Sequence, residues 1–325
     1  MTPEDKKQLQ AFTPANKANL EIGLASTNDN RSKRFVSFCD QLVQMVPQVR
    51  IRKRDADETA LPAIYAGGIC YRAIPGGPEL PPFLNLLENL NAEVPHILSS
   101  AVQSRLDQIK ITTPLKIYIT PHCPFCPKTV TDYTSLAVVS GFIKPTVIDG
   151  TLFPELAKAD QIQSAPTVIV DDQFRFSGSV DVTEVLEIIV SRDPMALSAD
   201  ALRGMLEEGK ANDVAELMLE SKKIMPAFIE LLASPKWPIR LSAMVVFETL
   251  AETDKILASD CITPLWRHFE QVDDKVKGDL LYIIGQTASK SAISKLQAVL
   301  AGTYSKEVKE AAIETLDELG ILTKK

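Results

Sequence analysis

Residues 114–128 read PLKIYITPHCPFCPK, in which two cysteines, Cys123 and Cys126, are separated by two residues. The apolar run up to Thr120 predicts a strand, and the apolar spacing from Lys128 to Ser140 predicts a helix. The first cysteine therefore lies just past a strand and the second in the first turn of a helix. Free N–H groups and the positive end of the helix dipole stabilise a thiolate there, which predicts that the pKa of Cys123 falls from its ordinary ~8.5 toward neutrality.

This placement predicts a working dithiol. Cys123 is the expected nucleophile and the more exposed of the two cysteines. Cys126, which a helical turn brings within bonding reach, is expected to resolve the mixed disulfide that Cys123 forms with a substrate cysteine. Pro124 and Pro127 suit a first helical turn, where the N–H group that proline lacks is not needed.

The alternative interpretation is a chance cysteine pair or one half of a zinc site. A structural zinc needs two more thiolate or imidazole ligands, and none of the remaining candidates is paired at ligand spacing. These candidates are Cys39, Cys70, Cys261, His96, His122 and His268. No metal is therefore predicted. Apolar neighbours predict that Cys39 and Cys70 are buried structural thiols rather than a second redox pair.

Length and composition limit the remaining possibilities. A chain of 325 residues predicts two or three domains, and 45% hydrophobic with 24% charged residues is ordinary globular usage. The net charge of −7 comes without a basic stripe, so nucleic acid is not an expected partner. No apolar segment follows the first charges and no run of 18 apolar residues occurs, so we predict a cytoplasmic protein without a membrane partner.

The first half of the chain predicts an internal duplication. APTVIVDD at residues 165–172 aligns with LPAIYAGG at residues 61–68. Around each segment the predicted elements follow a similar order. The first set is a strand at 19–24, a helix at 34–42, a strand at 48–52, two strands within 62–72 and a helix at 80–90. The second set is a strand at 114–120, helices at 128–140 and 155–160 around a strand at 142–148, a hairpin within 167–176 and a helix at 181–190.

Beyond Pro194 the strand signals vanish and apolar helix patterns continue to the end of the sequence. Segments beginning at Trp237, Lys275 and Glu307 resemble one another, and each opens with an aliphatic–basic pair. They are similar to HEAT repeats, which predicts helical pairs stacked into a solenoid; an unrelated helical bundle is the alternative. Trp237 and Pro238 either mark a recognition patch or set a turn between repeats.

The residues around the dithiol resemble a known family. Residues 111–192 resemble a thioredoxin or glutaredoxin fold, since Cys-Pro-Phe-Cys is close to the glutaredoxin Cys-Pro-Tyr-Cys. Residues 15–192 resemble the N-terminal domain of the flavin-dependent alkyl hydroperoxide reductase subunit and the protein disulfide oxidoreductases. That family places a cis-proline against the disulfide, and the resemblance assigns this role to Pro166.

The resemblance also implies a substrate-binding surface. It assigns backbone pairing with an incoming peptide to Ala165, and we expect Thr167, Pro124, Phe125 and His122 to complete that surface. His122, directly before the nucleophile, either favours the thiolate when protonated or is a loop residue without a role; both interpretations stay open.

Departures from the family pattern carry information as well. The first copy keeps a matching Pro62 but has Ser26-Thr27-Asn28-Asp29 where its cysteines are expected, so we predict a redox-inactive scaffold. The buried carboxylate of thioredoxins has no counterpart on the strand before the motif, because Ile117 stands there. No flavin- or nicotinamide-binding segment follows the tandem, so the reductant is expected to be another protein.

These observations predict a multidomain chain of α/β tandem thioredoxin folds followed by an all-α HEAT-like repeat domain. We expect a redox-inactive fold at 1–110, a redox-active fold at 111–192 and the helical domain at 195–325. The predicted function is a thiol–disulfide oxidoreductase that reduces protein clients, a peroxiredoxin among them, with no cofactor beyond the Cys123–Cys126 disulfide. An external thioredoxin-reductase-like flavoprotein is the expected reductant.

The alternative function is a redox-sensing adaptor or scaffold whose helical repeats bind a partner protein and whose dithiol alters that docking. In either case the motif leaves the direction of electron flow open, because similar Cys-x-x-Cys sites span roughly −120 to −270 mV.

Overall fold

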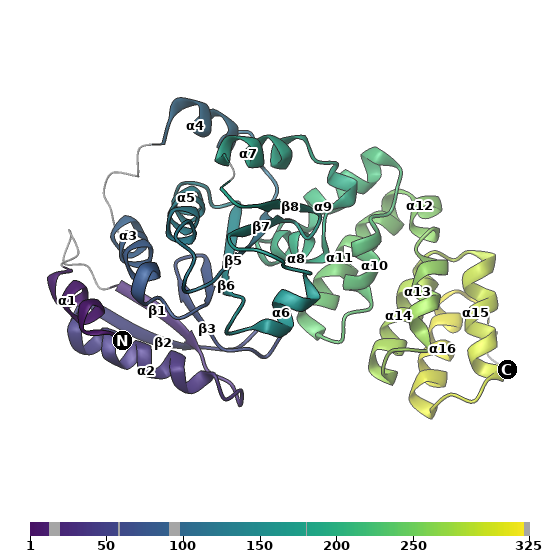
Figure 1. The fold of residues 1–325 in the computed structure, drawn as a ribbon. Helices are drawn as coiled ribbons and strands as arrows, with labels where there is room; N and C mark the ends of the chain where they lie inside the picture. The colour runs from purple at the N-terminus through teal and green to yellow at the C-terminus, as the bar shows by residue number, and fades with distance from the viewer. Residues whose placement is uncertain (13–19, 58, 91–97, 180, 322–325) are drawn as a thin grey trace. The chain divides into compact units, whose positions relative to one another are not determined.

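Figure 1 shows a computed structural model that describes residues 1–12, 20–57, 59–90, 98–179 and 181–321. Asn19, at the start of a predicted strand, and His96, one of the candidate zinc ligands, lie outside the described residues. The chain divides into two compact units, Met1–Ser191 and Arg192–Lys325. The first unit is mixed α/β and the second is helical.

Unit 1 is built on one sheet in the order β2-β1-β3-β4-β6-β5-β7-β8. Its strands are β1 (Leu20–Ala25), β2 (Val49–Arg54), β3 (Ala63–Ala66), β4 (Ile69–Arg72), β5 (Thr113–Ile119), β6 (Ile143–Asp149), β7 (Thr167–Val170) and β8 (Phe174–Ser177). The two halves of this sheet have the same topology. In each, two parallel strands (β1 with β2, β5 with β6) are followed by an antiparallel hairpin (β3–β4, β7–β8).

The two halves join through a parallel pair, β4 with β6, in which Cys70 lies opposite Thr146 and Arg72 opposite Ile148. Buried apolar side chains from both halves form one continuous core cluster. The predicted duplication is therefore present as two copies that share a single sheet and a single core. Below, the copy with β1–β4 is called the first copy and the copy with β5–β8 the second copy.

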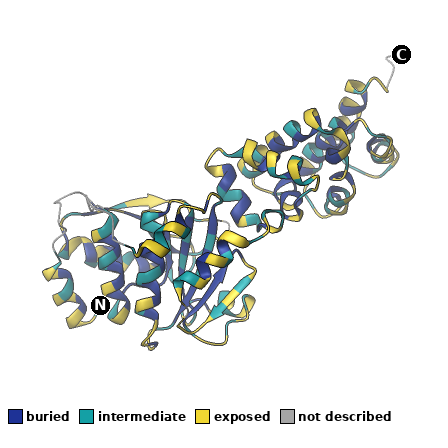
Figure 2. Ribbon diagram, turned by 90° about the horizontal axis from the view of Figure 1, so that it is seen from above, coloured by how far each residue is buried: buried dark blue, intermediate teal, exposed yellow. Residues whose placement is uncertain are grey.

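Helices cover the sheet of unit 1. They are α1 (Pro3–Ala11), α2 (Ser32–Met45), η1 (Gly77–Glu79), α3 (Leu80–Leu90), α4 (Ser100–Leu106), α5 (Cys126–Val139), α6 (Pro154–Ala159) and α7 (Val182–Ser191). α2 packs on β1, β2 and β3, α3 packs against α5, and α4 packs against α7. In Figure 2 these helices are buried on the sheet side and exposed on the other, as amphipathic surface helices are.

α1 was not expected, because its sequence is a polar leader. The helix begins with Pro3, and a capping box between Thr2 and Asp5 stabilises its N-terminus. Its Leu9 is fully buried in the core. A single apolar anchor gives little periodicity, so the sequence pattern does not reveal the helix. The predicted boundary inside unit 1, near residue 110, stays a prediction.

Unit 2 consists of helices throughout its described residues. They are η2 (Pro194–Ala196), α8 (Ala199–Glu207), α9 (Ala211–Ser221), α10 (Pro226–Leu232), α11 (Trp237–Thr253), α12 (Lys255–Ser259), α13 (Ile262–Phe269), α14 (Asp274–Gln286), α15 (Lys290–Ala301) and α16 (Lys306–Glu318). The three similar sequence segments are α11, α14 and α16, and they contact one another in that succession. The all-helical prediction is confirmed, and the succession is typical of stacked repeats.

A buried ion pair joins the first two of these helices. The Arg240 guanidinium, 3% exposed, lies 2.6 Å from a carboxylate oxygen of Asp279. The basic residue of the repeated aliphatic–basic pair thus bridges neighbouring helices in α11. Among the residues described, no helix is both long enough and apolar enough to cross a bilayer.

Candidate functional site

The two cysteines lie where the sequence predicts them, between β5 and α5. β5 ends at Ile119, and α5 begins at Cys126 with Phe125 as its N-cap. In the turn between them, the Cys123 N–H donates a hydrogen bond of 3.1 Å to the carbonyl oxygen of Thr120. The strand, the turn and the helix together place Cys123 at the N-terminus of α5.

Cys123 and Cys126 form a disulfide, with their Cα atoms 5.5 Å apart. The backbone N–H of Cys126 points at Cys123 and donates to its Sγ at 3.1 Å. When the pair is reduced, this donor and the helix dipole both favour a thiolate at Cys123 over a thiol. The local geometry therefore suits nucleophilic attack by Cys123.

Cys123 is less accessible than expected. Cys126 is fully buried, as predicted, but Cys123 is only 8% exposed. The order of exposure agrees with the prediction, whereas an openly exposed first cysteine does not. The neighbouring loops account for the difference, because the Cys123 Sγ lies 3.4 Å from the carbonyl oxygen of Ala165.

Ala165 belongs to the loop that faces the disulfide, and the peptide bond between Ala165 and Pro166 is cis. Pro166 is held in turn, since its carbonyl oxygen accepts a hydrogen bond of 2.8 Å from the Gly178 N–H. The structure thus brings the two cysteines together with Ala165 and Pro166 from 40 residues further along the chain, as the family resemblance implies.

Thr167 differs from its expected place on the substrate surface. Its side chain is buried, and its hydroxyl donates to the Ser164 carbonyl at 2.8 Å and lies 3.1 Å from the Ser177 hydroxyl. These contacts tie β7 to β8 and leave no side-chain surface for a client. By contrast, His122, Pro124 and Phe125 are exposed around the disulfide, and Phe125 is 62% exposed.

One titratable side chain near α5 was missed by sequence reasoning. Glu79 is 6% exposed, and neither of its carboxyl oxygens has a hydrogen-bond partner among the described residues. It is the last residue of η1, which contacts α5, the helix that begins at Cys126. Burial, and secondarily the negative charge of Asp149, raise the pKa of Glu79 to about 7.

This carboxyl comes from the first copy. In thioredoxins the buried carboxylate lies on the strand before the cysteines, where Ile117 stands here, so the family pattern does not indicate Glu79. Ile117 is fully buried and apolar, as expected. Glu79 stands between two prolines and a predicted helix, a context that gives no functional signal by itself. Only the contact between η1 and α5 relates it to the dithiol.

The first copy has a different set of residues at the equivalent place. α2 begins at Ser32 after the N-cap Arg31, just as α5 begins at Cys126 after Phe125. When the two helix starts are aligned, Asp29 is equivalent to Cys123 and Ser32 is equivalent to Cys126. The expected equivalents, residues 26–29, therefore lie three positions too early, although the prediction that no cysteine pair occurs here holds.

The other cysteines have the environment of structural thiols. Cys39 and Cys261 are buried, and burial raises the pKa of both thiols, that of Cys39 to about 12. Cys70 is only half-buried, which differs from the prediction, yet desolvation still raises its pKa to about 11. Thiols with raised pKa values are poor nucleophiles at neutral pH. Within the described residues, no three His, Cys, Asp or Glu side chains are grouped as metal ligands.

Comparisons with known proteins agree with this architecture. The family model described as "Thioredoxin domain" matches residues 113–191. A protein disulfide oxidoreductase from Aeropyrum pernix K1 has a similar structure, with a TM-score of 0.50 and 14% identity over 58% of this chain and 92% of that one. At this identity the likeness concerns the fold alone.

Two curated relatives resemble the chain in sequence. An NADH dehydrogenase of Ferdinandcohnia aciditolerans is 25% identical over 193 residues, 57% of this chain, and an alkyl hydroperoxide reductase subunit of Pseudomonas aeruginosa is 24% identical over 229 residues, 67% of this chain. The matches span 36% and 44% of these relatives' own lengths. The described part of unit 1 therefore holds two thioredoxin-like folds in tandem, and the second copy, which carries the disulfide, is similar to the thioredoxin domain over residues 113–191.

Proposed function

We propose that this protein is a thiol–disulfide oxidoreductase that reduces disulfides in client proteins through Cys123 and Cys126. The observation that carries the proposal is the Cys126 N–H, which donates to the Cys123 Sγ at the N-terminus of α5. The cis-Pro166 loop lies against the same sulfur, and the thioredoxin-domain match covers the whole site.

The first step is attack by the Cys123 thiolate on one sulfur of the client disulfide. A bond forms between Cys123 Sγ and that sulfur, the client's own disulfide bond breaks, and the other client sulfur leaves as a thiolate that takes up a proton. The exposed rim of His122, Pro124 and Phe125 is where a client segment would approach. The nearby Ala165 carbonyl, on the cis-proline loop, suits backbone pairing with that segment.

The second step is attack by the Cys126 sulfur on Cys123. This bond closes the enzyme disulfide and releases the second client sulfur as a thiol, so the client gains two electrons and two protons and the dithiol loses them. Cys126 must lose its proton in a fully buried site. We propose Glu79 as the proton acceptor, because a buried carboxyl with a pKa of about 7 exchanges protons readily near neutral pH.

The oxidised enzyme then needs a reductant, for which we propose an external dithiol of the thioredoxin-reductase type on a flavoprotein. The names of two relatives, an alkyl hydroperoxide reductase subunit and an NADH dehydrogenase, support a place in such an electron-transfer chain. A peroxiredoxin is the client class that the first of these names favours. The site chemistry is the same for other protein disulfides.

The test is reduction of insulin by the dithiothreitol-reduced full chain, compared with Cys123→Ser and Cys126→Ser. We expect Cys123→Ser to abolish reduction, since the nucleophile is lost, and Cys126→Ser to accumulate client joined to Cys123, visible on non-reducing gels. Cys39→Ser is the matched control, because its buried thiol lies outside the site. Equal activity of Cys123→Ser and the wild type would refute the proposal.

One observation favours the second candidate, an adaptor function of unit 2. Trp237, Leu241 and Val245 lie four residues apart on α11 and are 50%, 43% and 45% exposed, so they form an apolar stripe on one helix face. The Arg240 guanidinium lies 5.3 Å from the Trp237 ring centre and holds the indole in place. Trp237→Ala should weaken capture of a physiological partner yet leave insulin reduction unchanged; equal loss of both would exclude a separate adaptor role.

A further inference from the structure

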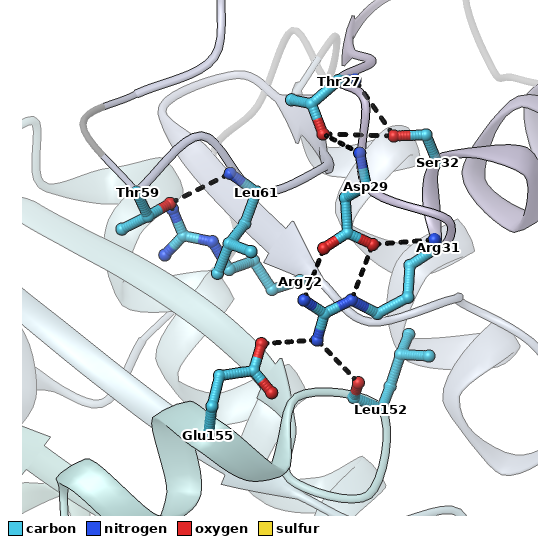
Figure 3. A network of polar contacts seen from close by, with 9 residues as sticks. All are labelled: Thr27, Asp29, Arg31, Ser32, Thr59, Leu61, Arg72, Leu152 and Glu155. Atoms are coloured by element: carbon cyan, nitrogen blue, oxygen red, sulfur yellow. Dashed lines mark hydrogen bonds and ion pairs between the residues drawn. The ribbon is translucent and has the colours of Figure 1, made fainter.

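The loop of the first copy that stands where the second copy has its dithiol reaches across to the second copy (Figure 3). Arg31 Nη1 donates to the carbonyl oxygen of Leu152 at 3.0 Å and pairs with Glu155 at 2.5 Å. The same guanidinium lies 4.2 Å from the ring centre of Phe153, a fully buried residue. Arg31 therefore contacts Leu152 and Phe153, in the turn between β6 and α6, by a hydrogen bond and a cation–π interaction, and Glu155, in the first turn of α6, by an ion pair.

Asp29 orients this guanidinium from the side of the first copy. Its carboxylate accepts hydrogen bonds from the Arg31 backbone N–H at 2.7 Å, from Nε at 2.9 Å and from Nη2 at 2.6 Å. These bonds hold the pKa of Asp29 at about 2, so the carboxylate stays charged at any physiological pH. Asp29, the equivalent of Cys123 in the first copy, thus holds the side chain of Arg31, the equivalent of Phe125, in one orientation.

The turn at residues 149–153 is linked to the Cys123 turn through the end of β5. Its Gly150 N–H donates to the carbonyl oxygen of Ile119, the last residue of β5, at 3.0 Å. The next residue, Thr120, accepts the hydrogen bond from the Cys123 N–H. Asp149 stabilises the turn, because its Oδ1 accepts hydrogen bonds from the N–H groups of residues 151 and 152 at 2.8 and 3.2 Å. Hydrogen bonds and short backbone segments therefore join Arg31 to the turn that carries Cys123.

We propose that Arg31 is a positioning residue for the dithiol: by fixing the turn at residues 149–153 it holds the end of β5 and the Cys123 turn in the geometry that stabilises the thiolate. The inference rests on the proposed dithiol function and gives the redox-inactive copy a task in catalysis. The competing explanation is that the contact only adds adhesion between the copies, as most partly exposed ion pairs do.

The two explanations differ in what happens to the reduced dithiol. If Arg31 positions the turn, its loss makes the backbone donors at Cys123 less well aligned and the thiolate less stable. A less stable thiolate favours the disulfide over the dithiol, because stabilisation of the reduced form is what makes such pairs oxidising. The equilibrium with glutathione then shifts toward the protein disulfide. Simple adhesion lowers thermal stability without this shift.

The experiment measures that equilibrium in the full chain for three variants. Arg31→Met keeps a stem of similar length and removes the guanidinium; we expect a shift of about threefold toward the disulfide, which is about 14 mV for a two-electron couple. Asp29→Asn weakens the orientation of Arg31 without touching the second copy, and should shift the equilibrium in the same direction by less. Arg52→Ala is the matched control, because it removes an exposed ion pair with Glu21 inside the first copy.

Alkylation of reduced Cys123 by iodoacetamide provides the second readout. Arg31→Met should slow it about threefold at pH 7, and Arg31→Lys, which keeps the charge, should recover part of the rate. If Arg31→Met matches Arg52→Ala in both readouts, the positioning role is refuted even where its melting temperature falls. If Arg31→Met does not fold, Asp29→Asn decides in the same way. Neither readout needs a client, so failure of the wild type to reduce insulin refutes the proposed function separately.

Discussion

The two copies in unit 1 have the same strand order and the same helix after the first strand, yet only the second has the residues of a redox site. At the helix N-terminus, Cys123 and Cys126 are matched by Asp29 and Ser32. At the loop before the hairpin, the second copy has a cis bond at Pro166, whereas the bond before Pro62 is trans. The fold thus supplies a helix N-terminus and a facing loop twice, and the chemistry depends on a few residues in each.

The first copy also supplies side chains that contact elements of the second copy. It contributes Glu79, whose buried carboxyl is next to the helix of the active site, and Arg31, whose guanidinium holds a turn of the second copy. Both contacts depend on the shared sheet, in which β4 of one copy pairs with β6 of the other. The duplication therefore gives the active copy groups that a single thioredoxin-like fold of this sequence would lack.

The largest difference between the copies is expected from their two matched prolines. Both Pro62 and Pro166 are buried and both precede a strand of a hairpin. Pro166→Ala removes the residue whose loop faces Cys123 and should lower the rate of insulin reduction about tenfold or more, since small displacements at a reacting centre have effects of this size. Pro62→Ala should leave the rate within about twofold, because no redox group faces it. Equal losses in both variants, measured with comparable melting temperatures, would show that stability alone is responsible.

The sequence predicted much of this contrast, because the information is local. A strand, Cys-x-x-Cys and a helix are adjacent in the chain, and the repeated segment before each hairpin is visible as a direct alignment of residues 61–68 with 165–172. The contributions of Glu79 and Arg31 could not be predicted in the same way. They depend on which edges of two half-sheets pair, and no pattern in the strands Ile69–Arg72 or Ile143–Asp149 specifies that choice. The three-residue error at Asp29 has a different, local cause, because the start of α2 has no side-chain cap that would mark it.

The contribution of Glu79 predicts a pH dependence of intermediate size. Its folded pKa of about 7 lies above the ordinary value of 4.5, so the folded state binds its proton more tightly than the unfolded chain does. The stability from this group is complete below pH 4.5 and is lost as the pH rises through 7, and the full effect is of the order of 3 kcal/mol. Glu79→Gln should therefore flatten the fall in unfolding free energy between pH 5 and pH 8, measured by urea denaturation.

The same substitution should affect catalysis. If Glu79 accepts the Cys126 proton, Glu79→Gln slows release of the client from the mixed disulfide by about tenfold at pH 8 and removes an inflection near pH 7 from the rate profile. Glu184→Gln, which alters an exposed carboxylate on α7 of the second copy, serves as the control. A pH–rate profile of Glu79→Gln that overlays the wild type would remove Glu79 from the mechanism, while the stability result would still test its burial.

The smallest effect is expected from an attempt to convert the first copy into the second. Asp29→Cys with Ser32→Cys, made in a chain that also carries Cys123→Ser and Cys126→Ser, places a Cys-x-x-Cys at the N-terminus of α2. The new pair lies at the N-terminus of α2, where the helix dipole favours a thiolate. The pair should therefore oxidise to a disulfide, which thiol titration would detect. The Arg31 side chain lies beside the new pair, and its contacts with Leu152 and Glu155 of the second copy, which do not involve Asp29, direct it away from a client. We therefore expect insulin reduction below about a hundredth of the wild-type rate, since correct orientation of the reacting groups accounts for effects of this order. Recovery of a large part of the wild-type rate would mean that a cysteine pair at a helix N-terminus is sufficient, and that the contrast between the copies lies in those two residues alone.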